Sequence, residues 1–167
     1  LTVLFDLTVA IEVGLLIACV LFMKRVMETT EISVIRDEID PGSGLDVAVH
    51  EEHLTVPRSV EVYEINGPYF FGIATKFEEL MAQLGDRPKV RVIRMRKVPF
   101  IDSTGIHNLT NLCVMSRREK IEVVLSGVND TVHAALQRSG FYELLGPDNI
   151  CPNINAALER ARRILGE

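Results

Sequence analysis

The pattern of apolar and polar positions divides the chain into three segments, and the first is almost continuously apolar. Residues 3–23 read VLFDLTVAIEVGLLIACVLFM and are followed directly by Lys24-Arg25. About 20 apolar residues are enough for a helix to cross a hydrocarbon core of roughly 30 Å. The run is too long for a typical signal peptide and lacks the charged beginning of one. We therefore predict a transmembrane helix over residues 1–25, with a buried helix of a soluble protein as the alternative.

Two acidic side chains, Asp6 and Glu12, interrupt this apolar segment. An ionised acid at the bilayer centre costs about 2.5–3.5 kcal/mol on the insertion scale, so such residues usually face protein or water. Six residues at about 100° each place the two acids roughly 120° apart on the helix. The pattern predicts a helix that packs among other membrane helices. The basic pair at its end predicts that the residues after it lie in the cytoplasm.

The second segment, residues 26–57, is predicted to be an acidic polar linker. Its central part, residues 28–53, is rich in Glu and Asp, contains Pro41-Gly42-Ser43-Gly44 and shows no sustained hydrophobic period. A segment of this composition does not bury enough apolar surface to form a core. We expect a linker or a mobile loop here, without a functional residue.

The third segment, residues 58–167, alternates short apolar runs with amphipathic stretches of helical period. The expected strands cover residues 59–65, 69–73, 89–95, 121–126 and 149–151. The expected helices cover residues 77–84, 103–118, 130–139 and 154–165. Strands that alternate with helices indicate βα units. The predicted fold class is α/β, with a mainly parallel sheet flanked by helices and one transmembrane-type helix before it.

One strand departs from the usual pattern of a buried parallel strand. Residues 89–95 carry Arg91 and Arg94, and Arg96 follows, whereas central parallel strands are usually continuously apolar. We expect these arginines to extend from the strand ends toward solvent along their aliphatic stems.

Charge and composition exclude several classes of function. The 18 Lys and Arg against 23 Asp and Glu give a formal net charge of −5, which argues against a general nucleic-acid binder. The three cysteines form no CxxC pair, so neither a disulfide framework nor a zinc knuckle is indicated. The chain contains no GxxxxGK[ST] loop and no GxGxxG loop. We predict no metal site, no cofactor and no nucleic-acid partner.

One local motif carries candidate chemistry, at the end of the strand that contains the arginines. Residues 98–106 read VPFIDSTGI, and Asp102 stands where the N-cap of the next helix belongs. Ser103, Thr104 and Gly105 then form the first helical turn. In α/β sheets this position commonly holds a ligand site, and the helix dipole favours an anion or an added phosphate there. The motif therefore predicts either an anion or partner site or, more simply, a capped helix with two small polar residues.

A hydrolase is a weaker alternative for the same motif. A helix brings Ser103 and His107 to one face, since they are four residues apart. No third residue and no oxyanion hole accompany the pair. We expect an ordinary half-exposed His107, no catalytic residue and no enzyme activity.

Residues 98–106 resemble the hallmark of the STAS domain, which occurs in bacterial anti-sigma-factor antagonists and in the C-terminal tails of SulP-type anion transporters. The order of elements over residues 60–165 is also similar, as is the stretch 129–141. Residues 5–14 (FDLTVAIEVG) resemble the last transmembrane helix of SulP transporters, and residues 66–71 (NGPYFF) resemble the opening hairpin of the transporter version. The order of span, linker and STAS domain is the most specific feature.

The resemblance implies the C-terminal part of a SulP-type secondary anion transporter in an inner or plasma membrane. Residues 1–25 would be its last membrane helix and residues 58–167 its cytoplasmic STAS domain. The family's anion site lies between half-helices far upstream, so no transport residue is expected here. The domain would serve assembly or regulation by protein contact. The expected partners are the remaining transmembrane helices, a cytoplasmic protein and a second copy of the chain.

The same resemblance implies an alternative, a phosphorylation-switched interaction module. In the antagonists the residue after the capping Asp is a serine phosphorylated by the partner anti-sigma kinase, and it falls on Ser103. An added charge of about −1.5 to −2 beside Asp102 would repel an acidic partner or recruit a basic one. Free antagonists have no membrane helix, which favours the transporter. Nucleotide binding, attributed to some STAS domains, is a third alternative.

Overall fold

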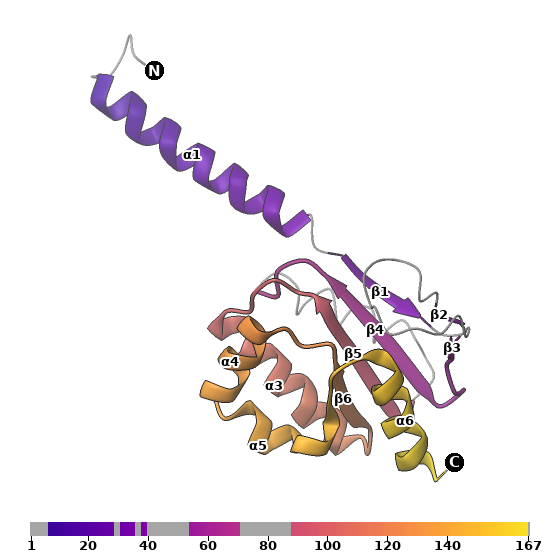
Figure 1. Ribbon diagram of the computed structural model, residues 1–167. Helices are drawn as coiled ribbons and strands as arrows, with labels where there is room; N and C mark the ends of the chain where they lie inside the picture. Colours follow the sequence, from indigo (N-terminus) through magenta and orange to yellow (C-terminus); the bar gives the residue numbers. More distant parts are fainter. Residues whose placement is uncertain (1–6, 29–30, 36–37, 40–53, 71–87, 167) are drawn as a thin grey trace. The chain divides into compact units, whose positions relative to one another are not determined.

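The structure is a computed structural model that describes residues 7–28, 31–35, 38–39, 54–70 and 88–166 (Figure 1). The chain forms two compact units, residues 1–30 and residues 31–167. The predicted helix at residues 77–84 and most of the predicted strand at 69–73 lie outside the described residues.

The first unit contains the helix α1 (Leu7–Glu28). Its 22 residues correspond to a length of about 33 Å at 1.5 Å per residue. Residues Leu7–Arg25 are apolar and long enough to cross a membrane, with a mean hydropathy of 2.2. Large apolar side chains are exposed all along α1; Leu15, for example, is 65% exposed. Glu12 is also exposed in α1, whereas Asp6 lies outside the described residues.

The second unit is built on a mixed five-stranded sheet with the strand order β1-β4-β5-β6-β7. The strands are β1 (Glu31–Ile35), β4 (Val60–Asn66), β5 (Val90–Lys97), β6 (Glu122–Ser126) and β7 (Ile150–Cys151). The strands β4 to β7 run parallel, and β1 pairs antiparallel with β4 at one edge. A separate two-stranded sheet joins β2 (Glu38–Ile39) to β3 (Leu54–Thr55). This architecture confirms the predicted fold class.

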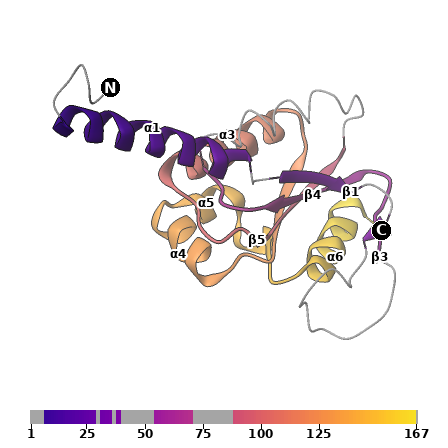
Figure 2. The same cartoon turned by 90° about the horizontal axis from the view of Figure 1, so that it is seen from above.

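Helices cover both faces of the larger sheet (Figures 1 and 2). The helices are α3 (Ser103–Arg118), α4 (Asp130–Arg138), α5 (Phe141–Leu145) and α6 (Ile154–Leu165), and a 3-10 turn η1 (Pro147–Asn149) precedes β7. The first three pack on one face, where Leu109 and Leu136 meet Ile93 of β5 in one buried cluster. Helix α6 packs on the other face, where Leu158 meets Val92 and Val124. The alternation of side chains along each strand supplies both cores.

The linker prediction for residues 26–57 is wrong at Glu31–Ile35. These residues form β1 and pair with β4, from Glu31 opposite Asn66 to Ile35 opposite Val62. Ile32 and Val34 pack against the core on the α3 side of the sheet. A run of five residues has too few positions to display a period, and its hydrogen-bond partners come from a strand far along the chain. This strand can be recognised only from its pairing with β4 at the edge of the sheet.

The prediction for the arginines of β5 is also wrong. Arg91 and Arg94 are only 7% and 3% exposed. The Arg91 guanidinium donates to Ser116 Oγ at 3.0 Å, and the Arg94 guanidinium lies 3.3 Å from the Glu64 carboxylate. The two arginines lie three residues apart and therefore point to opposite faces of the sheet. Each has a polar partner within the fold, which permits its burial.

Candidate functional site

The candidate site is the edge of the sheet where the parallel strands β4, β5 and β6 end. Helix α3 begins at this edge, and Asp102 is its N-cap, the role predicted from the sequence. The backbone of Asp102 is extended, with φ −94° and ψ 177°, and its Oδ1 accepts a hydrogen bond from Gly105 N at 2.6 Å. The carboxylate thus satisfies one of the first free N–H groups of the helix.

Ser103 and Thr104 are exposed in the first turn of α3. Ser116 and Ser126, by contrast, are fully buried. Ser103 is therefore accessible to a modifying enzyme, whereas those two serines are not. The Nε2 atom of His107 lies 3.1 Å from Asn111 Nδ2, within hydrogen-bonding distance.

Gly105 is required by a close approach that the sequence did not reveal. A Cβ built on Gly105 would overlap the carbonyl oxygen of Tyr69 and would lie 2.9 Å from Ile101 Cγ1. The loop after β4 therefore presses directly against the first turn of α3. Only glycine fits there, because any side chain would push the loop and the helix apart.

The segment between β5 and α3, residues 98–102, is clamped by hydrogen bonds from both sides. Tyr69 N donates to Phe100 O at 3.1 Å, and Asp102 N donates to Tyr69 O at 3.4 Å. From the other side, Asn129 Nδ2 donates to Val98 O at 2.5 Å. The backbone of this loop is therefore held in place, while the side chain of Phe100 remains 47% exposed.

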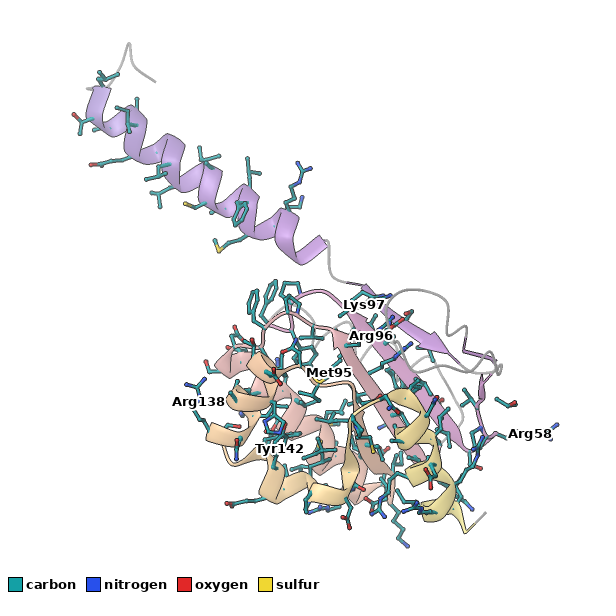
Figure 3. The ribbon with its side chains drawn as sticks, viewed as in Figure 1. Arg58, Met95, Arg96, Lys97, Arg138 and Tyr142 are labelled. Carbon is teal, nitrogen blue, oxygen red and sulfur yellow. The ribbon has the colours of Figure 1, made fainter. Side chains whose placement is uncertain are left out.

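A buried charged cluster joins the ends of β4 and β5. The Glu64 carboxylate lies 3.3 Å from Arg94, 3.8 Å from Arg96 and 3.7 Å from Lys97, measured between charged atoms. Figure 3 shows Arg96 and Lys97 at this end of the strands and Arg58 toward the other end of the sheet. The cluster lies at the register shift between β4 and β5. These ion pairs connect the end of β4 to the end of β5. The arginine pattern in β5 was the sequence signal for this cluster.

The groups whose pKa values are strongly raised lie buried in the domain. Burial raises the pKa of Tyr63 well above its ordinary value, and the hydrogen bond from its hydroxyl to Glu61 Oε2 at 2.7 Å adds to the rise. Burial also raises the pKa of Cys113 to about 12, so its thiol stays protonated at neutral pH. A thiol of this kind is a poor nucleophile. Over the described residues, no group of three His, Cys, Asp or Glu side chains is placed to hold a metal ion.

Comparison with known proteins agrees with the α/β fold. The STAS domain family matches residues 53–157, which is more than half of the chain. The chain belongs to the STAS domain family. It is 31% identical to YvdB of Bacillus subtilis (strain 168), which is named as a sulfate transporter, over 147 residues that cover 87% of this chain and 26% of that protein. The chain spans about a quarter of the length of the curated relatives it matches.

Solved structures place the domain among those of SulP transporters. A sulfate transporter family protein from Wolinella succinogenes is 39% identical, with a TM-score of 0.64, covering 68% of this chain and 93% of that one. The STAS domain of a SulP transporter from Vibrio cholerae is 34% identical, with a TM-score of 0.60, over 67% and 88% of the two chains. An anti-sigma factor antagonist from Thermotoga maritima shares the fold at 17% identity, with a TM-score of 0.55 and coverage of 65% and 92%. The domain is thus a STAS domain of the SulP sulfate transporter family.

Proposed function

We propose that the chain forms the last membrane span and the cytoplasmic STAS domain of a SulP-type secondary anion transporter. The observation that carries this proposal is the order of its parts. An apolar helix of membrane-spanning length precedes a STAS domain, and the match to a named sulfate transporter extends over 87% of the chain. In this proposal α1 packs among the remaining transmembrane helices of the inner or plasma membrane. Asp6 and Glu12 then face those helices or water rather than lipid.

The STAS domain acts in this proposal through protein contact, in assembly or in regulation, and not as an enzyme. The exposed first turn of α3 offers Ser103 and Thr104 as contact residues, while the titratable groups with strongly raised pKa values are buried in the cores. A second copy of the chain and a cytoplasmic protein are the candidate partners.

Deleting residues 60–167 from the parent transporter tests this role. Loss of assembled transporter from the membrane is the result expected for a role in assembly. A changed uptake rate at unchanged abundance is the result expected for regulation. Normal abundance together with normal uptake would contradict both roles.

A phosphorylation switch at Ser103 is the second candidate, favoured by the exposure of this serine at a helix N-terminus. The dipole of α3 stabilises added negative charge at that position, whereas the neighbouring Asp102 opposes it. Intact mass of the protein from native cells is expected to show one phosphate, lost in Ser103→Ala and kept in Thr104→Ala. A protein that carries no phosphate under any growth condition would rule the switch out.

A further inference from the structure

We propose that two copies of the STAS domain pair through the exposed side of α3, with the two helices antiparallel about a two-fold axis. The surface is called the α3 stripe below. It consists of Thr104, His107, Asn111 and Met115, together with Phe100 just before the first turn. The inference rests on the proposed function and deepens it, because it names a second copy of this chain as the partner of the α3 contact surface.

The exposed positions of α3 form one line along the helix. Four of them follow one another at intervals of three, four and four residues: Thr104, His107, Asn111 and Met115. At 100° per residue these positions fall within about 80° of the helix surface. The opposite side of α3, which includes Leu109, is buried in the core. The exposed line therefore has the spacing by which one helix packs along another.

The composition of the α3 stripe is that of a protein interface. Residues 103–116 contain no Asp, Glu, Lys or Arg. The shorter surface helix α6, by contrast, carries several charged side chains: Glu159, Arg160, Arg162 and Arg163. Phe100 and Met115 are the two large apolar side chains that stand exposed among the described residues of the domain, at 47% and 50%, and both belong to the stripe. Few charges together with aromatic and Met side chains distinguish the centre of a protein interface from ordinary surface.

The charges at the two ends of α3 favour a second copy of the chain as the partner. Asp102 caps the start of the helix, and Arg118 lies in its last turn. When two copies meet antiparallel, the acidic start of each helix lies beside the basic end of the other, and the two helix dipoles also attract each other. A two-fold axis midway between His107 and Asn111 places His107 of one copy opposite Asn111 of the other. Phe100 of one copy then lies opposite the Arg118 guanidinium of the other, which an aromatic face attracts.

The size of this contact explains why the pairing requires a membrane. The 16 residues of α3 give it a length of about 24 Å. Packed helices lie about 8–10 Å apart, so the contact covers on the order of 250 Å² per copy, less than the roughly 800 Å² of a standard stable interface. Copies that α1 holds in one bilayer meet at a much higher effective concentration than copies in solution. A small self-complementary surface is then sufficient for pairing.

Cysteine cross-linking of the 167-residue chain in phosphatidylcholine–phosphatidylglycerol vesicles tests the pairing. Cys19 is exposed and is replaced by Ser, whereas Cys113 and Cys151 are buried and are kept. In that background Asn111→Cys places a thiol within about 12 Å of its copy across the two-fold axis. A short membrane-permeant bismaleimide then joins the two copies.

The matched control is Asn155→Cys, which replaces an exposed asparagine of α6 on the other face of the sheet. The expected result is a cross-linked dimer with Asn111→Cys and only collisional background with Asn155→Cys. Adding Met115→Glu to the Asn111→Cys chain is expected to lower the yield about tenfold, because it buries an unpaired charge on each copy. Met115→Gln, which adds no charge, is expected to retain most of the yield.

Each other outcome overturns the inference in a recognisable way. Equal yields for Asn111→Cys and Asn155→Cys, in a chain that stays in the vesicles after alkaline carbonate extraction, reject the pairing and leave the proposed function standing. A dimer at Asn111→Cys that Met115→Glu does not weaken shows that a different surface joins the copies, which rejects the α3 stripe. A chain that alkaline carbonate releases from the vesicles does not span the bilayer, and this result overturns the inference and the proposed function together.

Discussion

The helices α3 and α6 begin in the same way at the same edge of the sheet, but their first turns have different surroundings. Each follows a parallel strand, and each has an extended N-cap whose side-chain oxygen accepts from the N–H three residues on. The distances are 2.6 Å at Asp102 and 2.9 Å at Asn153. An acidic or amide cap is therefore common helix chemistry in this protein and does not by itself mark a functional site.

The difference between the two helix starts lies in what touches the capped turn. The third helical residue is Gly105 in α3 and Ala156 in α6. Gly105 lies against the backbone of Tyr69, whereas α6 accommodates a methyl group at the matching position. The start of α3 is thus locked to a neighbouring loop, and its exposed residues are presented on a rigid base. That combination, rather than the cap, makes the α3 start the candidate contact surface.

Substituting Gly105, which lies against the backbone of Tyr69, is expected to have the largest effect on stability. Gly105→Ala forces the first turn of α3 away from Tyr69 and is expected to lower the free energy of unfolding by about 3 kcal/mol. The matched control, Ala156→Gly, is expected to cost at most about 1 kcal/mol, the ordinary helix-propensity difference. Urea unfolding of residues 31–167 measures both. Equal effects of the two substitutions would show that the contact with Tyr69 is not tight.

Substituting Asn129, the N-cap of α4, is expected to have the second-largest effect on stability. Its Oδ1 accepts from Val132 N at 2.9 Å, and its Nδ2 donates to the loop before α3 at Val98. Asn129→Ala removes both bonds and is expected to cost about 2 kcal/mol. Asn153→Ala removes one cap bond and is expected to cost about 1 kcal/mol. The same urea titration compares them, and a smaller loss for Asn129→Ala than for Asn153→Ala would contradict the clamp.

Removing the cap of α3 is expected to have an intermediate effect. Asp102→Ala should lower the free energy of unfolding by about 1 kcal/mol, the same as Asn153→Ala in α6. Asp102→Asn keeps an acceptor in place and should restore most of this loss. Thermal unfolding of the three variants provides the comparison. A loss at Asp102 several times larger than the loss at Asn153 would mean that the carboxylate has a partner besides Gly105 N.

The exposed hydroxyls are expected to have the smallest effect on stability. Ser103→Ala and Thr104→Ala should each change the free energy of unfolding by less than about 0.5 kcal/mol, because the side chains are exposed in the first turn. Any change in transporter abundance or uptake caused by these variants in the parent protein then reflects a lost contact or modification. A large loss of stability in either variant would assign the hydroxyl a structural role.

Periodicity predicted most of the domain because most of its elements bury a regular face. The strands β4, β5, β6 and β7 and the helices α3, α4 and α6 all occur where the pattern placed them, within a few residues. The short helix α5 was missed, since five residues are too few to show a helical period. The edge strand β1 was missed for the same reason, and the burial of Arg91 and Arg94 depended on partners from other elements.

The candidate site, too, was predicted only in part from the sequence. The sequence indicated the Asp102 cap, because an N-cap residue acts on its own helix within three positions. It did not indicate the reason for Gly105, the clamp from Asn129 or the exposure of Phe100. The hydrogen bond between Asn129 and Val98, for example, joins loops that are about 30 residues apart in sequence, and no local pattern records such contacts.

The apolar span, the α/β class and the STAS resemblance could all be recognised in the amino-acid sequence, because each depends on local periodicity or on a contiguous motif. The pairing of Glu31–Ile35 at the sheet edge and the contact of Gly105 with Tyr69 became visible only in the folded chain. The folded chain also shows that the loop carrying Phe100 is held from both sides. The physical reason is that hydrogen bonding and close packing between distant segments depend on where the whole fold places them.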